Sequence, residues 1–321
     1  MLFRSKAPVL SAGNWGGVGL HPRGNFEGFL RAGSEQKWLE VHGDTHFSHF
    51  YSNYGLALQK KFFGYFLKGE KNGWDQAPKV LLNIRHPGEQ FVLRAENEWP
   101  LARTQWTRYY LHPDGMRLDP TENTTATTLS YHTRSEGLAF STGPLQQAME
   151  ITGPLAARLR LSSDTQDADV FLALRVFDPQ GKEVSFIGSN DPRTPVALGW
   201  LRASHRKTDP AQSLPYRPWH THDEKQWLVP GEPVDLDVEI WPTSIVIPQG
   251  YTLIFNVRGK DYRYDEEGVI LPFDTQPMYG VGPFSHENPV DRPHEIFHTT
   301  NHLHFGPGHQ PYVLLPIIPK A

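Results

Sequence analysis

The stretch KWLEVHGDTHF, residues 37–47, has residue types and a spacing that suit proton-transfer chemistry. An apolar run from Trp38 to Val41 enters a short polar loop that ends in His46. A histidine placed after the C-terminal end of a strand is how hydrolases built on a parallel sheet present their general base. Such a base needs a serine to activate and an acid to hold its imidazole.

Two other histidine groups resemble metal sites, and their surroundings argue against that interpretation. HEIFH, residues 294–298, fits H-E-x-x-H, which binds zinc only when a helix puts both histidines on one face. Pro293 before it and the β-branched Thr299 and Thr300 after it favour a strand and a loop.

The second group is PWHTHDE, residues 218–224, in which His220 and His222 would share one side of a strand. No third ligand is indicated nearby, and the composition favours a polar surface loop. We therefore predict neither a metal site nor a cofactor.

Composition and missing motifs exclude several function classes. Cysteine is absent, which excludes disulfides, thiolate chemistry and cysteine-ligated zinc. There is no G-x-S-x-G nucleophile turn and no glycine-rich phosphate loop. The 31 basic and 35 acidic residues give a net charge of −4, spread along the chain, which argues against a nucleic-acid-binding face. No apolar run approaches the ~20 residues of a membrane span, and without an export signal we expect a cytoplasmic protein.

Residues 1–77 have the pattern of an α/β unit. The runs 7–12 and 37–42 are of buried-strand length, and residues 26–34 leave room for a two-turn helix. A second helix is predicted from Tyr51, because aromatic and apolar residues recur every three or four positions up to Phe66. Gly69 is a plausible C-cap for this helix, and we expect the apolar stripe to pack in a core.

From residue 78 to 321 the sequence predicts strands and turns. Alternating or continuous apolar runs indicate strands at 157–163, 169–178, 234–240, 251–257 and 312–318. The threonine-rich segment 121–133 shows no periodicity and is predicted to be a loop. Several short strands in this pattern indicate an antiparallel β-sandwich, plausibly a jelly roll.

The first part poses a physical difficulty. A parallel sheet needs cover on both faces, and two strands with one aromatic helix do not provide a closed core. We expect residues 1–77 to be the last part of a larger α/β domain, so that the chain is N-terminally incomplete or pairs with a separate polypeptide.

Taken together, these stretches resemble the cocaine esterase / X-Pro dipeptidyl-peptidase family of serine hydrolases. VLSAGNWGG is similar to the family's strand before its G-W-x-D turn, and LEVHGDTH to its G-P-W-x-H segment. LQKKFFGYFLKGEKNGW resembles the helix that closes the hydrolase domain. NEWPLARTQWTRYYL, LGWLRASHRKTDP and HFGPGHQPYVLLPIIP resemble parts of its C-terminal jelly roll.

The resemblance assigns the general base to His46. The family's usual acid position is occupied by Gly17, which cannot orient an imidazole. Asp44 and Glu27 are the nearby substitutes, and neither is preferred over the other; the alternative is an acid in a segment missing from this sequence. The nucleophilic serine has no counterpart in this sequence and would lie upstream of Met1.

The sequence thus predicts a mainly β chain with two parts. Residues 1–77 would be the final strand–helix part of an α/β-hydrolase domain, and residues 78–321 a jelly-roll, galactose-binding-like β-sandwich. The implied activity is hydrolysis of a small-molecule ester or amide, X-Pro dipeptidyl bonds included, with a homodimer or a separate hydrolase segment as partner. The rival hypothesis is a non-catalytic binding or assembly module that uses Trp200, Trp219 and Trp227.

Overall fold

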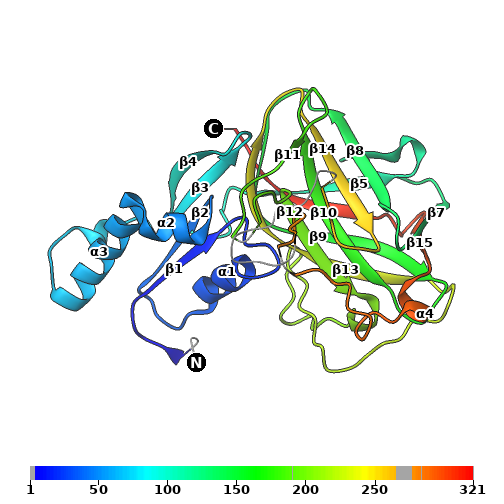
Figure 1. Cartoon of the computed structure of the whole chain (residues 1–321), viewed down its shortest axis with the longest axis horizontal. Helices are drawn as coiled ribbons and strands as arrows, with labels where there is room; N and C mark the ends of the chain where they lie inside the picture. The colour runs from blue at the N-terminus through cyan, green and yellow to red at the C-terminus, as the bar shows by residue number, and fades with distance from the viewer. Residues whose placement is uncertain (1–3, 190, 265–276, 283, 321) are drawn as a thin grey trace.

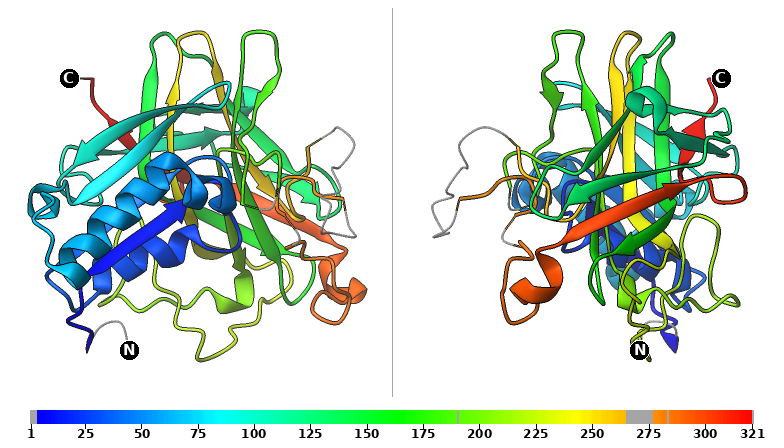
Figure 2. Two further views of the ribbon diagram at one scale, coloured as in Figure 1. Left: turned by 60° about the vertical axis from the view of Figure 1, so that its left-hand side comes forward. Right: turned by 90° about the vertical axis from the view of Figure 1, so that its right-hand side faces the viewer.

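The computed structural model describes residues 4–189, 191–264, 277–282 and 284–320, with only the backbone at His46. The chain folds into a small sheet flanked by helices and a larger β-sandwich beside it (Figure 1). Turning the molecule brings the small sheet and its helices in front of the sandwich strands (Figure 2). No helix among the described residues has the length and apolar character to cross a membrane.

The small sheet has four strands in the order β1-β2-β3-β4. They are β1 (Val9–Asn14), β2 (Lys37–His42), β3 (Val80–His86) and β4 (Gln90–Glu96). The first three run parallel, and β4 returns antiparallel to β3. Since β3 and β4 belong to this sheet, it extends past residue 77, where the sequence placed the domain boundary.

Helices cover both faces of this sheet because β2 is apolar on both sides. Leu39 and Val41 pack against α1 (Pro22–Arg31), and Trp38, on the opposite face, packs against α3 (Asn53–Lys68). The short helix α2 (His46–Tyr51) precedes α3, and the 3₁₀ turn Trp74–Gln76 follows it.

The predicted helix after Tyr51 is present, but it begins at Asn53. The Ser52 hydroxyl accepts a hydrogen bond from the Gly55 amide at 3.0 Å and caps it. Gly69 ends it in a left-handed conformation at φ 68°, as its C-cap position predicts. The stripe packs in the core from Leu58 onward.

The larger sheet closes on itself. Its strands follow the order β13-β12-β10-β14-β8-β6-β5-β16-β9-β15-β7, β11 pairs with β10, and β13 also pairs with β9. Their bounds are β5 Gln105–His112, β6 Arg117–Asp119, β7 Thr127–His132, β8 Leu138–Pro144, β9 Met149–Ser163, β10 Asp169–Phe177, β11 Glu183–Val184, β12 Ala197–Arg202, β13 Val234–Ile247, β14 Thr252–Arg258, β15 Thr300–Phe305 and β16 Tyr312–Ile318. Short helical turns lie at Asp114–Met116, at Ala203–His205 and in α4, His294–Phe297.

The structure confirms the mainly β architecture and corrects one segment. All five predicted sandwich strands are present, within β9, β10, β13, β14 and β16. The segment 121–133 was predicted to be a loop, but its second half forms β7, which pairs antiparallel with β15. β7 lies at the end of the strand order, where an edge strand needs little apolar alternation, and its threonines are β-branched and suit extended backbone.

A buried arginine joins the two parts of the molecule. Arg85 on β3 is 1% exposed, and its guanidinium donates hydrogen bonds of 2.8 Å to the carbonyls of Val196 and Ser244 in the sandwich. The ring of Phe186 lies 4.3 Å from the guanidinium carbon. Burial lowers the pKa of Arg85 to about 9, against the opposing charge of Glu89, so the group remains cationic at pH 7.

We predict that Arg85→Met destabilises the fold by about 3–5 kcal/mol, because two buried carbonyls lose their donor. Urea denaturation followed by circular dichroism would measure this loss. The matched control is Arg103→Met, which removes a partly exposed pair with Glu96 and should cost no more than about 1 kcal/mol. Equal losses in the two variants would contradict a structural role for Arg85.

Candidate functional site

The C-terminal ends of β1 and β2 lie side by side and bring two loops together. Asn14 is in register with His42, and the Trp15 amide donates to the His42 carbonyl at 2.9 Å. The Asn14 side-chain amide donates to the carbonyl of Asp44 in the second loop. In open α/β sheets this edge is where ligands bind.

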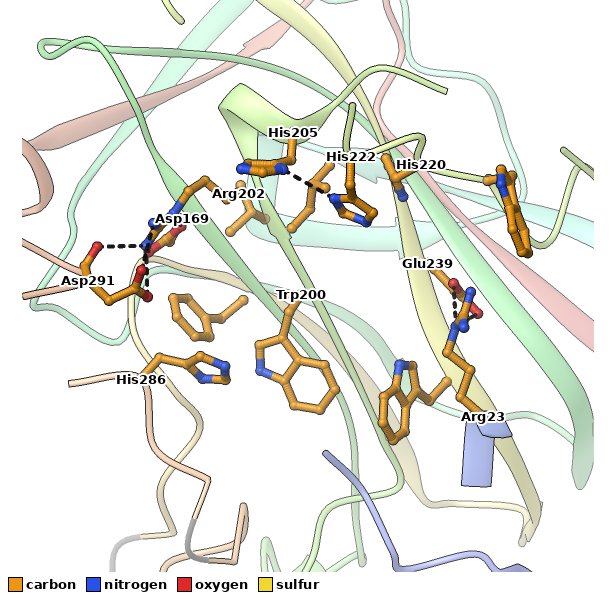
Figure 3. Close-up of a pocket in the computed structure, with 15 residues that line it drawn as sticks. Arg23, Asp169, Trp200, Arg202, His205, His220, His222, Glu239, His286 and Asp291 are labelled. Carbon is orange, nitrogen blue, oxygen red and sulfur yellow. Dashed lines mark hydrogen bonds and ion pairs between the residues drawn. The ribbon is translucent and has the colours of Figure 1, made fainter. Parts of the chain in front are cut away.

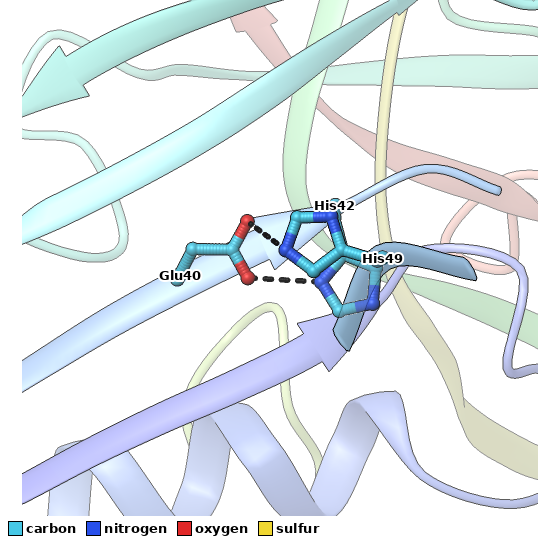
Figure 4. Close-up of side chains that lie close together, drawn as sticks. All are labelled: Glu40, His42 and His49. Atoms are coloured by element: carbon cyan, nitrogen blue, oxygen red, sulfur yellow. Dashed lines mark hydrogen bonds and ion pairs between the residues drawn. The ribbon is translucent and has the colours of Figure 1, made fainter. Parts of the chain in front are cut away.

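Three titratable side chains meet at this end of β2: Glu40, His42 and His49 (Figure 4). Glu40 and His42 point to the same face because side chains alternate along a strand. Nδ1 of His42 lies 2.9 Å from one Glu40 carboxylate oxygen. The helix α2 brings Nε2 of His49 to 3.4 Å from the other oxygen.

The Glu40 carboxylate is buried and held ionised. Its side chain is 0% exposed, and burial alone would raise its pKa. The hydrogen bonds and charges of His42 and His49 outweigh burial and hold the pKa of Glu40 below its usual value. Asn83 on β3 donates a further hydrogen bond of 3.3 Å to the same carboxylate.

The same three residues offer metal-ligating atoms within 4.8 Å of one another, but their orientation suits hydrogen bonding. The two imidazole rings are stacked, with centroids 3.6 Å apart and planes within 4°. A nitrogen lone pair lies in the plane of its ring, so two parallel stacked rings cannot both direct lone pairs at one ion. Each ring instead directs one nitrogen at one carboxylate oxygen.

This arrangement can move a proton. A carboxylate that accepts the Nδ1 hydrogen of a histidine fixes the tautomer and stabilises the imidazolium. With Nδ1 of His42 engaged by Glu40, Nε2 is the nitrogen through which His42 would exchange a proton. A buried acid–imidazole pair at the ligand-binding edge of the sheet is therefore the best candidate site.

The predicted base, His46, is the first residue of α2, four positions beyond His42. Its side chain lies outside the described part of the structure. Asp44, one of the two suggested acids, adopts φ 58° in the same loop. Its carboxylate accepts a hydrogen bond of 2.6 Å from the Thr45 amide, and the structure does not bring it to Glu40 or His42.

Glu27 and Gly17 contact other parts of the chain. Glu27, on α1, pairs with Arg31 at 2.9 Å and with Arg217 of the sandwich. At Gly17 a β-carbon would approach the Ser189 hydroxyl to 3.0 Å, tighter than an ordinary contact. An aspartate would therefore fit at Gly17 only if its neighbours moved.

Sequence reasoning missed Glu40, His42 and His49 as a group. The available signal was the E-V-H spacing within a predicted buried strand, which puts an acid and an imidazole on one face. His49 could not be placed without the fold, because α2 had not been predicted as a separate helix.

The other two histidine groups differ from their predicted forms. HEIFH forms one helical turn, α4, and His298 lies just outside it at φ −103°, with its ring 3.8 Å from that of His294. His220 and His222 lie in a loop as predicted, but they line a pocket of about 580 Å³ together with Trp200 and Trp219. Burial lowers the pKa of His220 to about 4. Trp227 is half exposed.

We predict that Glu40→Gln makes the fold less dependent on pH in the acid range. Because the pKa of Glu40 is lower in the folded state, its ionised form stabilises the protein above the unfolded pKa of about 4.3. That contribution should disappear as the pH falls through the folded-state pKa. Denaturant unfolding should show the wild type to be more stable than the variant by about 1–3 kcal/mol at pH 7 and by less at pH 3. The same stability difference between wild type and variant at both pH values would contradict this prediction. Glu70→Gln, at the surface, serves as the control.

Comparison with known proteins identifies a matching domain family and two related esterases. Residues 72–314 match the X-Pro dipeptidyl-peptidase C-terminal non-catalytic domain. The chain is 23% identical over 307 residues to a cocaine esterase from Rhodococcus, covering 82% of this chain and 46% of that protein. Over 130 residues it is 31% identical to a putative serine esterase from Mycobacterium bovis, covering 39% of this chain and 19% of that protein.

Solved structures agree with this relationship over nearly the whole chain. A CocE/NonD family hydrolase from Staphylococcus aureus superposes with a TM-score of 0.86 at 28% identity, covering 99% of this chain and 55% of that one. An α-amino acid ester hydrolase shares the fold, with a TM-score of 0.67 at 14% identity over 98% of this chain and 56% of that one. The chain thus spans about half the length of these relatives. It belongs to the CocE/NonD hydrolase family and carries that family's X-Pro dipeptidyl-peptidase C-terminal domain.

Proposed function

We propose that this chain supplies the general base of a serine hydrolase that cleaves an ester or amide through an acyl-enzyme. The observation that carries the proposal is the buried pair of Glu40 and His42 at the C-terminal end of β2. Relatives named as an esterase and a hydrolase support the same reaction class. The matched domain, residues 72–314, is described as non-catalytic, which supports a site on β1 and β2, before that match begins.

The base would act twice in each cycle. It takes the proton of the serine hydroxyl as that oxygen attacks the carbonyl, and then gives the proton to the leaving alcohol or amine. Glu40 would stabilise the imidazolium that forms between these steps. His42 is the imidazole that the described geometry supports, and His46 is the one that the family resemblance assigns.

The nucleophile would come from a hydrolase segment that this sequence does not contain, since it has no G-x-S-x-G. Two features would receive such a segment. β1 is the edge strand of the small sheet. Beside it, α2 and α3 expose apolar side chains, of which Tyr51 is 70%, Phe47 66% and Leu67 76% exposed. Large apolar side chains gathered on an exposed face commonly mark an interface.

We predict that the base is revealed by His42→Asn and His46→Asn. The tagged chain, isolated from its native cells with whatever binds it, should hydrolyse a p-nitrophenyl ester and label with a fluorophosphonate. Substituting the base should lower turnover by about 10³-fold or more and abolish labelling. Loss in one variant alone identifies the base, and His309→Asn, at the exposed surface, is the control. Unchanged activity in both variants would overturn the proposal.

We also predict that Phe63→Glu with Leu67→Glu separates the chain from its serine-bearing partner. Both side chains are exposed on α3, so the fold should persist while a charged face resists association. The fluorophosphonate-labelled polypeptide should no longer co-purify, whereas Val290→Glu, an exposed apolar residue elsewhere, should leave it bound. If light scattering shows instead that a homodimer dissociates, the exposed face binds a second copy of this chain.

A further inference from the structure

A pocket on the sandwich contains a second cluster of histidines, separate from Glu40 and His42 (Figure 3). The pocket has a volume of about 580 Å³ and is lined by β10, β12, β13 and the loop between β12 and β13. His205, His220 and His222 stand along one side, with Trp200 across from them. The ring of Trp241, which also lines the pocket, lies 5.5 Å from that of Trp200. Its arginines are already paired: Arg23 with Glu239, and Arg202 with Asp169 and Asp291.

Two of these histidines face each other across the loop. Nδ1 of His205 lies 3.1 Å from Nδ1 of His222. Backbone hydrogen bonds fix this approach, from the Asp209 amide to the Trp219 carbonyl at 2.8 Å and from the Thr221 amide to the Lys207 carbonyl at 3.1 Å. His222 adopts φ 53°, a conformation uncommon for a residue with a side chain. The loop therefore holds the two imidazoles in a defined position.

This separation matches the spacing of two ligands on one metal ion. Zinc binds imidazole nitrogen at about 2.0–2.1 Å, so two nitrogens on a tetrahedral ion lie about 3.3 Å apart. The two rings are tilted by 44°, with centroids 5.3 Å apart. Tilted rings can direct both lone pairs at one point, which the stacked rings of His42 and His49 cannot do.

His220 is positioned to add a third nitrogen. Its Nε2 donates to the backbone carbonyl of Asp237 at 3.0 Å, which leaves Nδ1 as the ligating atom. Metal-bound histidines are commonly held in this way through their other nitrogen. The ring of His220 lies 6.0 Å from that of His222, so His222 would have to turn toward His220 to complete the set, while His220 keeps its bond to Asp237. Further coordination positions would open toward the pocket.

We propose that His205 and His222, joined by His220, bind one divalent transition-metal ion at this pocket. A donor set made only of imidazoles favours zinc, cobalt, nickel or copper over magnesium and calcium, which prefer oxygen ligands. This proposal is independent of the hydrolase chemistry proposed for β2, and the two are tested by different experiments.

Titration calorimetry of the purified, chelator-treated full chain with Zn²⁺, repeated with Co²⁺ and Mg²⁺, tests the site. We expect one Zn²⁺ per chain and no Mg²⁺ binding. The absorption spectrum of bound Co²⁺ should indicate a low coordination number. His205→Ala and His222→Ala should each weaken Zn²⁺ binding by about 100-fold or more, and His220→Ala by about 10-fold or more. Circular dichroism of each variant would verify that it is folded.

Two control variants separate this site from the other histidine groups. His49→Ala removes a ligating atom beside Glu40, and His298→Ala removes one from HEIFH, so both should keep wild-type Zn²⁺ affinity. The proposal is overturned if no ion binds, if His205→Ala and His222→Ala bind normally, or if binding is lost in a control variant instead.

Discussion

The position of the candidate site depends on the burial of one cation. Arg85 lies between the small sheet and the sandwich with almost no contact with water, and its guanidinium is satisfied by sandwich carbonyls. A buried charge without such partners would cost several kcal/mol, so β3 is held in one position relative to the sandwich. β3 in turn pairs with β2 and places Asn83 against Glu40. The geometry of the acid–imidazole cluster therefore depends on how the small sheet packs against the sandwich.

Glu40 is a buried anion, and it needs hydrogen-bond donors just as the buried cation Arg85 needs acceptors. A carboxylate inside a sheet core is unfavourable unless donors surround it, and here two imidazoles and an amide do so. His42 at the end of β2 and His49 on α2 meet this requirement. In the family pattern an acid stands in the loop after β1, where this chain has Gly17 with little room for a larger side chain. A carboxylate within β2 offers an acid where that loop has none.

The sequence predicts the elements of this molecule better than it predicts the site. β2 was expected at residues 37–42 and lies there, because a short apolar run bounded by polar residues has few alternatives. β7 was missed because Leu129 and Tyr131 are its only apolar core-facing residues and the threonine-rich stretch before them hides so short an alternation. Arg85 gave no signal, since an arginine in a strand is usually exposed and only the sandwich explains its burial. His49 could not be assigned because its contact with Glu40 depends on where α2 begins.

The three histidine groups differ in what their orientation permits, although the sequence presents them alike. HEIFH has the letters of a zinc motif, yet its helix ends before the second histidine. His42 and His49 stack on each other, and each directs one nitrogen at the Glu40 carboxylate, an orientation suited to holding and moving a proton. His205 and His222 carry no motif, and their rings are tilted with a nitrogen separation of 3.1 Å. Ring orientation, which no spacing rule encodes, is the basis on which we distinguish the proposed proton-transfer site from the proposed metal site.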